Sequence, residues 1–256
     1  MLEITSASNA KYKYIKSLSM KKERQKHGEY TVEGIKSVSD AVKSERKVLT
    51  IAVSETFFER EAFDYPKETE LIKISDTIFD KLCDTTAPQG IIAVIKAEED
   101  AEFVPDTDKV YVYCDGVNDP GNLGTIIRTA DAAGMGGVIL SKGTVDLYSP
   151  KTVRASMGSF FNIKTVCGKT AEDLKKYREM GFKLIGGALR ENSEDYRNAD
   201  MRAPAIIIVG NEANGISEEI LDMCSCVKIP ILGSAESLNV SVAAGILMYE
   251  SVRQST

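Results

Sequence analysis

Short apolar runs alternate with amphipathic stretches along this chain, and the alternation predicts an α/β fold. Apolar runs of about four to eight residues that are rich in valine and isoleucine are typical of buried strands. Clear examples are residues 48–53, 91–95, 109–115 and 205–210, which read V-L-T-I-A-V, I-I-A-V-I, K-V-Y-V-Y-C-D and A-I-I-I-V-G. Polar or glycine-bearing segments separate them, so strands with intervening helices are expected.

The first 96 residues contain enough such elements to predict a small α/β domain. The expected strands are residues 30–34, 48–53, 71–74 and 91–95, and the expected helices are residues 35–42, 55–63 and 76–82, the last capped by Asp76. Strand and helix therefore alternate throughout this part of the chain.

An acidic stretch, residues 96–108, follows this predicted domain. It contains Pro105 and shows no apolar period, which is typical of a domain boundary. The predicted division is therefore a domain at 1–97, a linker at 98–108 and a second domain at 109–256.

The second domain is predicted to have glycine-bearing polar loops where its strands end. After the strand at 109–115, the expected elements are helices at 125–133 and 151–161 and strands at 137–140, 184–188, 205–210 and 227–231. Loops at 116–124, 210–215 and 232–239 follow three of the strands. Open α/β sheets bind ligands at the carboxyl ends of their strands. The dinucleotide fingerprint G-x-G-x-x-G is missing, so a nicotinamide or flavin enzyme is disfavoured.

The stretch at residues 229–252 combines an apolar strand end, a polar loop and a long apolar helix. The loop carries Gly233, Ser234, Ser237 and Asn239. A loop at a helix start presents backbone N–H groups and short side-chain donors, which suits a small polar ligand. The alternative is that S-L-N-V-S merely caps a core helix.

A basic segment at residues 9–26 predicts one helix with a narrow buried stripe. Ile15, Leu18 and Met20 form the stripe among seven lysine and arginine residues. Tyr12 and Tyr14 lie between lysines, where they could stack on nucleic-acid bases. They could equally pack on their own domain.

The charge is distributed unevenly along the chain. The net charge is −6, but residues 1–50 carry 11 lysine and arginine residues against 6 acidic ones, while residues 51–105 carry 5 against 13. A basic segment on an acidic protein marks either a nucleic-acid contact or an ordinary solvated helix face.

Composition excludes several classes of protein and site. No apolar run reaches the length of a membrane span and no signal peptide precedes the first strand, so a cytoplasmic protein is expected. The five cysteines are odd in number and fit no zinc spacing. His27 is the only histidine, which disfavours a Ser-His-Asp triad and a histidine-rich metal site.

Three motifs in the second half stand in order and at a characteristic spacing. They read N-L-G-T-I-I-R-T-A-D-A-A-G with Asn122 and Arg128, I-V-G-N-E-A-N-G-I with Glu212, and I-P-I-L-G-S-A-E-S-L-N-V-S-V-A-A-G-I with Ser237 and Asn239. This set resembles the SpoU, or TrmH-like, family of RNA ribose 2′-O-methyltransferases in the SPOUT superfamily.

The first half is similar to the substrate-binding domain of that family, which resembles an RNA-binding ribosomal protein. The similar segments are K-K-E-R, Y-T-V-E-G and T-x-x-P-Q-G-I-x-A-V. The resemblance implies an RNA substrate, with ribosomal RNA expected, and RNA contacts from Lys11, Lys21, Lys22 and Arg24.

For the second half, the resemblance implies S-adenosylmethionine as the cofactor, held by a knotted C-terminal part of a domain with a parallel sheet. It implies no metal. The expected cofactor contacts, made largely through backbone groups, are Gly187, Gly210, Asn211, Ile229, Leu238 and Asn239. The resemblance also implies a homodimer through this domain, in which Ser237 and Asn239 of one chain meet Arg128 of the other.

The implied reaction transfers a methyl group from a sulfonium to a ribose 2′-hydroxyl, which is a poor nucleophile until it loses its proton or is polarised. The family gives that task to the motif arginine, Arg128. Arg128 is either a base or a group that holds phosphate and stabilises alkoxide charge. The role of a base is awkward for arginine, because a guanidinium stays protonated in proteins. Asn122, Glu212, Ser237 and Asn239 would orient the reacting groups.

Two rival functions remain at this stage. One is a non-catalytic RNA-binding protein of the same fold, and the other is a tRNA-directed 2′-O-methyltransferase. A small-molecule methyltransferase is disfavoured because such a substrate needs no basic RNA platform. The sequence does not separate a housekeeping enzyme from one that confers antibiotic resistance.

Overall fold

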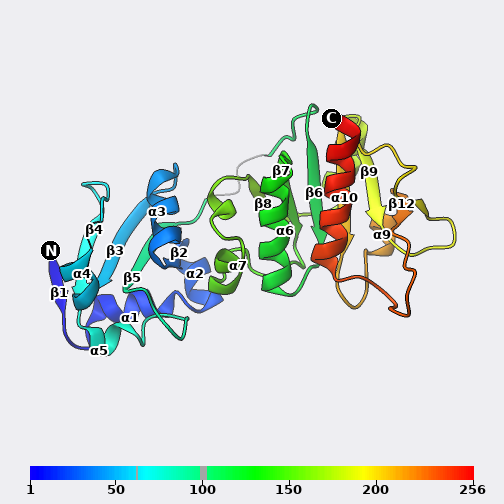
Figure 1. The fold of residues 1–256 in the computed structure, drawn as a ribbon. Coiled ribbons are helices and arrows are strands. Elements are labelled where there is room, and N and C mark those ends of the chain that lie inside the picture. The colour runs from blue at the N-terminus through cyan, green and yellow to red at the C-terminus, as the bar shows by residue number, and fades with distance from the viewer. Residues whose placement is uncertain (62, 99–102) are drawn as a thin grey trace. The chain divides into compact units, whose positions relative to one another are not determined.

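The computed structural model describes residues 1–61, 63–98 and 103–256 (Figure 1). The chain forms two compact units. The first comprises Met1–Glu99 together with Tyr148–Phe161, and the second comprises Asp100–Leu147 together with Asn162–Thr256. Among the described residues, no helix combines the length and apolar character that crossing a membrane requires.

A five-stranded mixed sheet forms the centre of the first unit. Its strands, in spatial order, are β1 (Leu2–Ile4), β4 (Glu70–Ile74), β3 (Val48–Ser54), β5 (Ile91–Lys96) and β2 (Glu29–Glu33). β3 pairs parallel with β4 and antiparallel with β5. Its helices are α1 (Ala10–Ser17), α2 (Lys21–His27), α3 (Ile35–Lys43), α4 (Glu55–Arg60), α5 (Asp76–Phe79) and α7 (Pro150–Ala155). The expected small α/β unit is present, and β1 is a strand that the apolar pattern missed.

The single helix predicted at residues 9–26 is wrong, because the chain breaks between α1 and α2. Asn9 caps α1 by accepting the N–H of Lys11 at 2.8 Å. The guanidinium of Arg24 folds back and donates to the carbonyls of Leu18 at 2.8 Å and Ser19 at 2.6 Å. These carbonyls end α1 and lack helical partners further along the chain, so a side chain satisfies them instead.

Three other predicted helices differ from the structure at their ends. α4 ends at Arg60, and α5 ends at Phe79 with Ser75, not Asp76, at its N-cap. The Asp76 carboxylate instead accepts the N–H and the hydroxyl of Thr56, at 3.1 Å and 2.6 Å. The predicted helix at 151–161 is α7 followed by a 3-10 turn, Ser159–Phe161, since Met157 adopts a left-handed φ of 53°.

Residues 148–161 pack within the first unit, although they lie far along the chain. The Tyr30 ring lies 4.7 Å from that of Tyr148 and 5.7 Å from that of Phe160. Arg154 donates to the Asp84 carboxylate at 2.6 Å. The contiguous division at residues 97 and 108 stays a prediction, and the compact units differ from it in this segment.

The second unit contains a seven-stranded parallel sheet, which confirms the predicted fold class. Its strands, in spatial order, are β10 (Glu194–Asp195), β12 (Ser225–Lys228), β9 (Lys183–Gly187), β11 (Ala205–Gly210), β6 (Val110–Asp115), β7 (Gly137–Ser141) and β8 (Thr165–Lys169). β6 and β11 pair along six residues, from Val110 with Ala205 to Asp115 with Gly210. Their carboxyl ends therefore lie side by side.

Helices cover both faces of this sheet, as a parallel sheet requires. Side chains of α8 (Ala171–Glu179) and α9 (Glu218–Leu221) share a core with Tyr111, Tyr113, Ile206 and Ile208 of the central strands. The helices α6 (Pro120–Ala132) and α10 (Val240–Ser255) run side by side, and α10 also packs on β11 (Figure 1).

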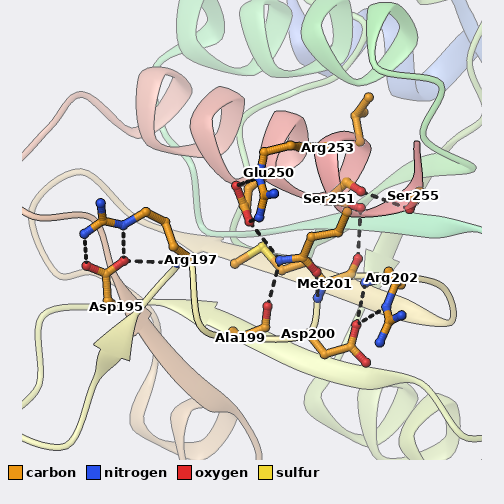
Figure 2. A network of polar contacts seen from close by, with 12 residues as sticks. Asp195, Arg197, Ala199, Asp200, Met201, Arg202, Glu250, Ser251, Arg253 and Ser255 are labelled. Atoms are coloured by element: carbon orange, nitrogen blue, oxygen red, sulfur yellow. Dashed lines mark hydrogen bonds and ion pairs between the residues drawn. The ribbon is translucent and has the colours of Figure 1, made fainter.

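The C-terminal turns of α10 are anchored to residues 199–201 by side chains (Figure 2). Gln254 donates to the carbonyl of Ala199 at 2.9 Å and accepts the N–H of Met201 at 2.8 Å. The Ser251 hydroxyl donates to the carbonyl of Met201 at 2.9 Å. Gln254 thus binds a backbone N–H and a backbone carbonyl of this irregular segment. These bonds fix the C-terminal end of α10, the helix that Asn239 caps at its N-terminal end.

Candidate active site

The candidate site lies at the carboxyl ends of β6 and β11. The segment 116–119 leads from β6 into α6, and the segment 211–217 leads from β11 into α9. α6 starts at Pro120 with Asp119 as its N-cap, five residues earlier than predicted. Asn122 therefore belongs to the first turn of a helix, which holds it more firmly than a loop would.

The Glu212 carboxylate connects these two segments. It accepts the backbone N–H groups of Asn118 at 3.0 Å and Asp119 at 3.2 Å, and the side-chain amide of Asn122 at 2.8 Å. Burial by itself would raise the pKa of Glu212, but the donors from Asn122, Asn118 and Asp119 outweigh it and lower that pKa below its usual range. Glu212 is therefore a carboxylate at neutral pH.

Asn122 joins Glu212 to the third motif. Its side-chain oxygen accepts an N–H of the Asn239 side chain at 3.0 Å. The Asn239 oxygen caps α10, accepting the N–H of Ser241 at 2.9 Å, the Ser241 hydroxyl at 2.6 Å and the N–H of Val242 at 3.3 Å. The structure thus brings one residue of each motif into a chain that runs Glu212, Asn122, Asn239.

Arg128 and Ser237 stand apart from this chain. Both are exposed, and neither side chain makes a hydrogen bond or an ion pair with any residue in the described parts of the chain. Arg128 lies six positions after Asn122 on α6, which places it about 9 Å further along the helix axis and about a third of a turn away. One copy of the chain therefore does not bring the predicted catalytic set together.

The comparisons with known proteins agree with the motifs on this sheet edge. Residues 109–249 match the SpoU rRNA Methylase family, and residues 9–93 match an MRM3-like substrate binding domain. The chain belongs to the SpoU family. It is 37% identical over 250 residues to the 23S rRNA (guanosine(2553)-2′-O)-methyltransferase RlmP of Bacillus subtilis (strain 168), covering 97% of this chain and 98% of that protein.

Two solved structures of other proteins have the fold of this chain, and both contain bound AdoMet. The AdoMet-bound rRNA methyltransferase from Sinorhizobium meliloti is 32% identical, with a TM-score of 0.88 over 99% of this chain and 98% of that one. The SpoU methyltransferase AviRb from Streptomyces viridochromogenes, in complex with AdoMet, is 30% identical, with a TM-score of 0.86 over 96% and 98%.

The segment at residues 231–238 fits the recognition of S-adenosylmethionine, the cofactor of this SpoU protein. Within the described chain, its backbone N–H and carbonyl groups make no hydrogen bonds with protein partners. Its apolar side chains are open as well, since Leu232 is 97% exposed and Leu238 is 37% exposed. Free backbone groups beside exposed aliphatic side chains suit a ligand with a flat apolar ring and polar edges. Ile229, two residues before this segment, is half-buried.

Gly210 lies so close to the protein's own backbone that no side chain fits there. A methyl group at Gly210 would lie 2.1 Å from the carbonyl carbon of Gly215 and 2.2 Å from the nitrogen of Ile216. The loop after β11 therefore excludes any side chain at this position, and the predicted backbone contact of Gly210 with the cofactor stays a prediction. A methyl group at Gly187 would lie 3.0 Å from Leu247 Cδ1, so core packing explains this glycine too.

Replacing Gly210 with alanine is expected to displace the 211–217 loop and with it Glu212. The collision is with backbone, which does not move aside without cost, so the free energy of unfolding should fall by roughly 1–3 kcal/mol. Thermal unfolding measures this. Gly233→Ala is the matched control, because nothing lies within 4 Å of a methyl group there. Equal melting temperatures for the two variants would contradict the steric account.

The predicted RNA contacts in the first unit differ in their accessibility. Lys21 and Lys22 are exposed, whereas Lys11 forms an ion pair with Glu70 at 2.6 Å. Arg24 is 6% exposed and bonded to backbone carbonyls, which argues against the predicted RNA contact.

Lys13 and Lys16 are exposed residues that the sequence analysis did not select. They lie three positions apart on α1, so they share a face, and the described residues offer no ion-pair partner to either. Their spacing within the helix was the signal that could have identified them. The two tyrosines of the same helix pack instead of stacking, because Tyr12 is buried and the Tyr14 hydroxyl donates to Glu29.

Proposed function

We propose that this protein transfers a methyl group from S-adenosylmethionine to a ribose 2′-hydroxyl of ribosomal RNA. The observation that carries the proposal is the hydrogen-bonded chain of Glu212, Asn122 and Asn239, which joins the three SpoU motifs at one edge of the sheet. The names of the relatives, including RlmP, support ribosomal RNA as the substrate class. The cofactor supplies an electrophilic methyl group on a sulfonium.

The residues of this chain position the nucleophile. As the bond from oxygen to the methyl carbon forms and the bond from sulfur to that carbon breaks, the hydroxyl proton leaves to water, since the one histidine, His27, belongs to the first unit. Glu212 fixes the amide of Asn122, so the Asn122 oxygen faces Asn239 and the Asn239 amide keeps one N–H free for a ligand. Arg128 brings a permanent positive charge that binds a phosphate and stabilises the developing alkoxide. Ser237, whose hydroxyl is exposed beside Asn239, adds a short donor on the side of the cofactor segment.

The active unit in this proposal is a homodimer formed through the second compact unit. Val242 and Tyr249 are each 51% exposed, and with the half-buried Ile246 they form one apolar stripe on α10. A two-fold interface places this stripe against its own copy and brings Arg128 of one chain to Asn239 of the other. That arrangement accounts for an exposed arginine without a partner on a motif helix.

The knot implied by the family belongs to this proposal as well. Its support is the strand order: β12 lies beyond β9, yet the following helix α10 packs on β11 and α6. The chain must therefore cross back over the sheet between Lys228 and Val240.

The direct experiment incubates the purified protein with labelled S-adenosylmethionine and, separately, protein-free 23S ribosomal RNA, assembled large subunits and total transfer RNA. Ribose 2′-O-methyl groups are then mapped by their resistance to alkaline cleavage. Label in ribosomal RNA at one nucleotide is the expected result. Label confined to transfer RNA would overturn the substrate class, and cofactor binding without transfer to any RNA would overturn the activity.

RNA binding by the first unit gives a separate prediction. Replacing Lys13, Lys16, Lys21 and Lys22 with glutamine should weaken RNA binding and flatten its dependence on salt. Each lost phosphate contact lowers the slope of log K against log salt by about 0.7–0.9. Filter binding at several salt concentrations measures both effects.

The matched control replaces four other lysines of the same unit, which are also exposed: Lys43, Lys47, Lys67 and Lys81. Both variants change the net charge equally. If they weaken binding to the same extent, the RNA follows overall charge, and the surface formed by α1 and α2 is not its site.

A further inference from the structure

The backbone of Gly116, directly after β6, is held by two side chains, one at its N–H and one at its carbonyl. Gly116 adopts a left-handed φ of +70°, which turns the chain out of the strand. Its N–H donates to the hydroxyl oxygen of Ser141, at the end of β7, at 2.9 Å. Its carbonyl accepts the side-chain amide of Asn211, in the loop after β11, at 2.8 Å. Residues at the ends of three neighbouring strands thus meet at one residue, Gly116.

A chain of hydroxyls supports Ser141 in this arrangement. The Thr144 hydroxyl donates to the carbonyl of Cys114 at 2.9 Å. Its oxygen can therefore accept a hydrogen bond from the Ser141 hydroxyl, which lies 3.2 Å away. Ser141 then accepts from Gly116. The regular pairing of β6 with β7 ends at Cys114 and Leu140, and these hydroxyls continue it for one more peptide.

Asn211 is committed to the protein on both ends of its amide. Besides donating to Gly116, its side-chain oxygen accepts the N–H groups of Ala213 at 2.9 Å and Asn214 at 3.0 Å. Its backbone pairs with Gly215 in both directions. These bonds explain the residue without the cofactor contact that the resemblance implied for it.

The backbone of Gly116 lies next to the groups that orient Glu212. The N–H groups of Asn118 and Asp119, which bind the Glu212 carboxylate, come two and three residues after Gly116. Asn211 immediately precedes Glu212. The loops after β6 and β11 are therefore joined twice, once by Asn211 with Gly116 and once by Glu212 with Asn118 and Asp119. The first connection sets the position of the N–H donors in the second.

We propose that Ser141 and Asn211 are positioning residues for methyl transfer: by fixing the Gly116 backbone on both sides of its Cα they hold the donors that orient Glu212 and, through it, Asn122. They touch neither substrate nor cofactor in this account. The proposal deepens the proposed function and rests on it for its catalytic consequence, whereas the fixing of the loop is measurable without any reaction.

The first experiment compares Ser141→Ala with Ser141→Thr, which restores a hydroxyl at the same carbon. Ser141→Ala should lower kcat about 10-fold, as expected for one hydrogen bond of about 1.4 kcal/mol lost from a preorganised site. KM for RNA should change less than about twofold, because Ser141 does not bind it. Ser141→Thr should recover most of the lost kcat.

Ser255→Ala is the matched control, since it removes a hydroxyl that donates to a helix carbonyl at the far end of α10 in the same unit. It should retain the wild-type kcat. A Ser141→Ala variant with unchanged kcat would overturn the proposal. So would a Ser141→Thr variant as slow as Ser141→Ala, because side-chain volume and not the hydroxyl would then decide the rate.

Amide hydrogen exchange of residues 116–119 provides a readout that needs no activity. Exchange at Gly116 and Asn118 should accelerate in Ser141→Ala and return towards the wild-type rate in Ser141→Thr. If the wild-type protein methylates no RNA, the proposed function fails, and the exchange rates alone decide the positioning role. Unchanged protection at Gly116 in Ser141→Ala would overturn it in that case too.

Asn211→Asp tests the hydrogen bond to the carbonyl of Gly116. Aspartate keeps the oxygen that accepts from Ala213 and Asn214 but loses the donor to Gly116, so the 211–215 turn should survive. A fall in kcat of about 10-fold or more is expected. Because both changes release the backbone of the same residue, the double variant with Ser141→Ala should lose less than the product of the single losses. A purely multiplicative loss would contradict a joint action on Gly116.

Discussion

Replacing Arg128 with alanine is expected to lower kcat/KM for RNA methylation by about 100- to 1000-fold without lowering the melting temperature. The loss corresponds to removing one preorganised donor from a site where negative charge develops. The stability should persist because the Arg128 side chain is exposed and makes no hydrogen bond or ion pair with the described residues. Arg178→Ala, an exposed arginine on α8, is the matched control and should retain activity.

Arg128→Lys separates the two chemical roles left open for this residue. A lysine keeps the positive charge but can also lose its proton, so a base at this position would give a rate that rises steeply at high pH. A charge stabiliser would instead give a partly active variant whose pH profile resembles that of the wild-type protein. The pH profile of kcat distinguishes these outcomes.

Mixed dimers test whether Arg128 acts on the partner's site. Arg128→Ala and Asn239→Ala should each be nearly inactive alone. Co-expressed, random pairing makes half of the dimers mixed, and in each of these one of the two sites has both wild-type groups. Up to about a quarter of all sites should then be active. Purified mixed dimers without activity would show that Arg128 serves its own chain or that more residues are shared.

Replacing Glu212 with glutamine is the second change expected to have a large effect. Glutamine has one acceptor oxygen and an NH₂ group, so it cannot accept from Asn118, Asp119 and Asn122 together. At least one donor is then left without a partner, and Asn122 loses its fixed orientation. Activity should fall about 100-fold, with cofactor affinity measured by calorimetry as a separate readout. Wild-type activity in this variant would exclude the orienting role.

The pH dependence of stability gives Glu212 an additional signature. Because its pKa is lowered in the folded protein, ionised Glu212 stabilises the fold above the ordinary glutamate pKa, and this contribution is lost as the pH falls through the lowered value. The difference in melting temperature between wild type and Glu212→Gln should therefore be largest near neutral pH and shrink in acid. A difference that grows in acid would have the wrong sign.

The sequence by itself determined most of the elements and the chemistry at their ends. The apolar runs at 110–115 and 205–210 form β6 and β11, because β-branched residues in a short continuous run suit a strand buried on both faces. The polar loops after these strands then lie at one sheet edge because parallel strands share a direction. The loops themselves could be selected on that basis, and the resemblance to the SpoU family then identified Asn122, Glu212 and Asn239 within them.

Only the tertiary structure decided which of these residues meet. Asn122 bonds to residues 90 and 117 positions away, and no local pattern encodes such a contact. Arg24 is a second case, because a basic run placed it at the surface, whereas the carbonyls of Leu18 and Ser19, only six and five residues earlier, hold it in the interior. Gly210 is a third case, since its lack of a side chain is required by the backbone of Gly215. Local preference selects strands and helices through short-range sterics, whereas side-chain partners depend on the register of strands that are far apart in sequence.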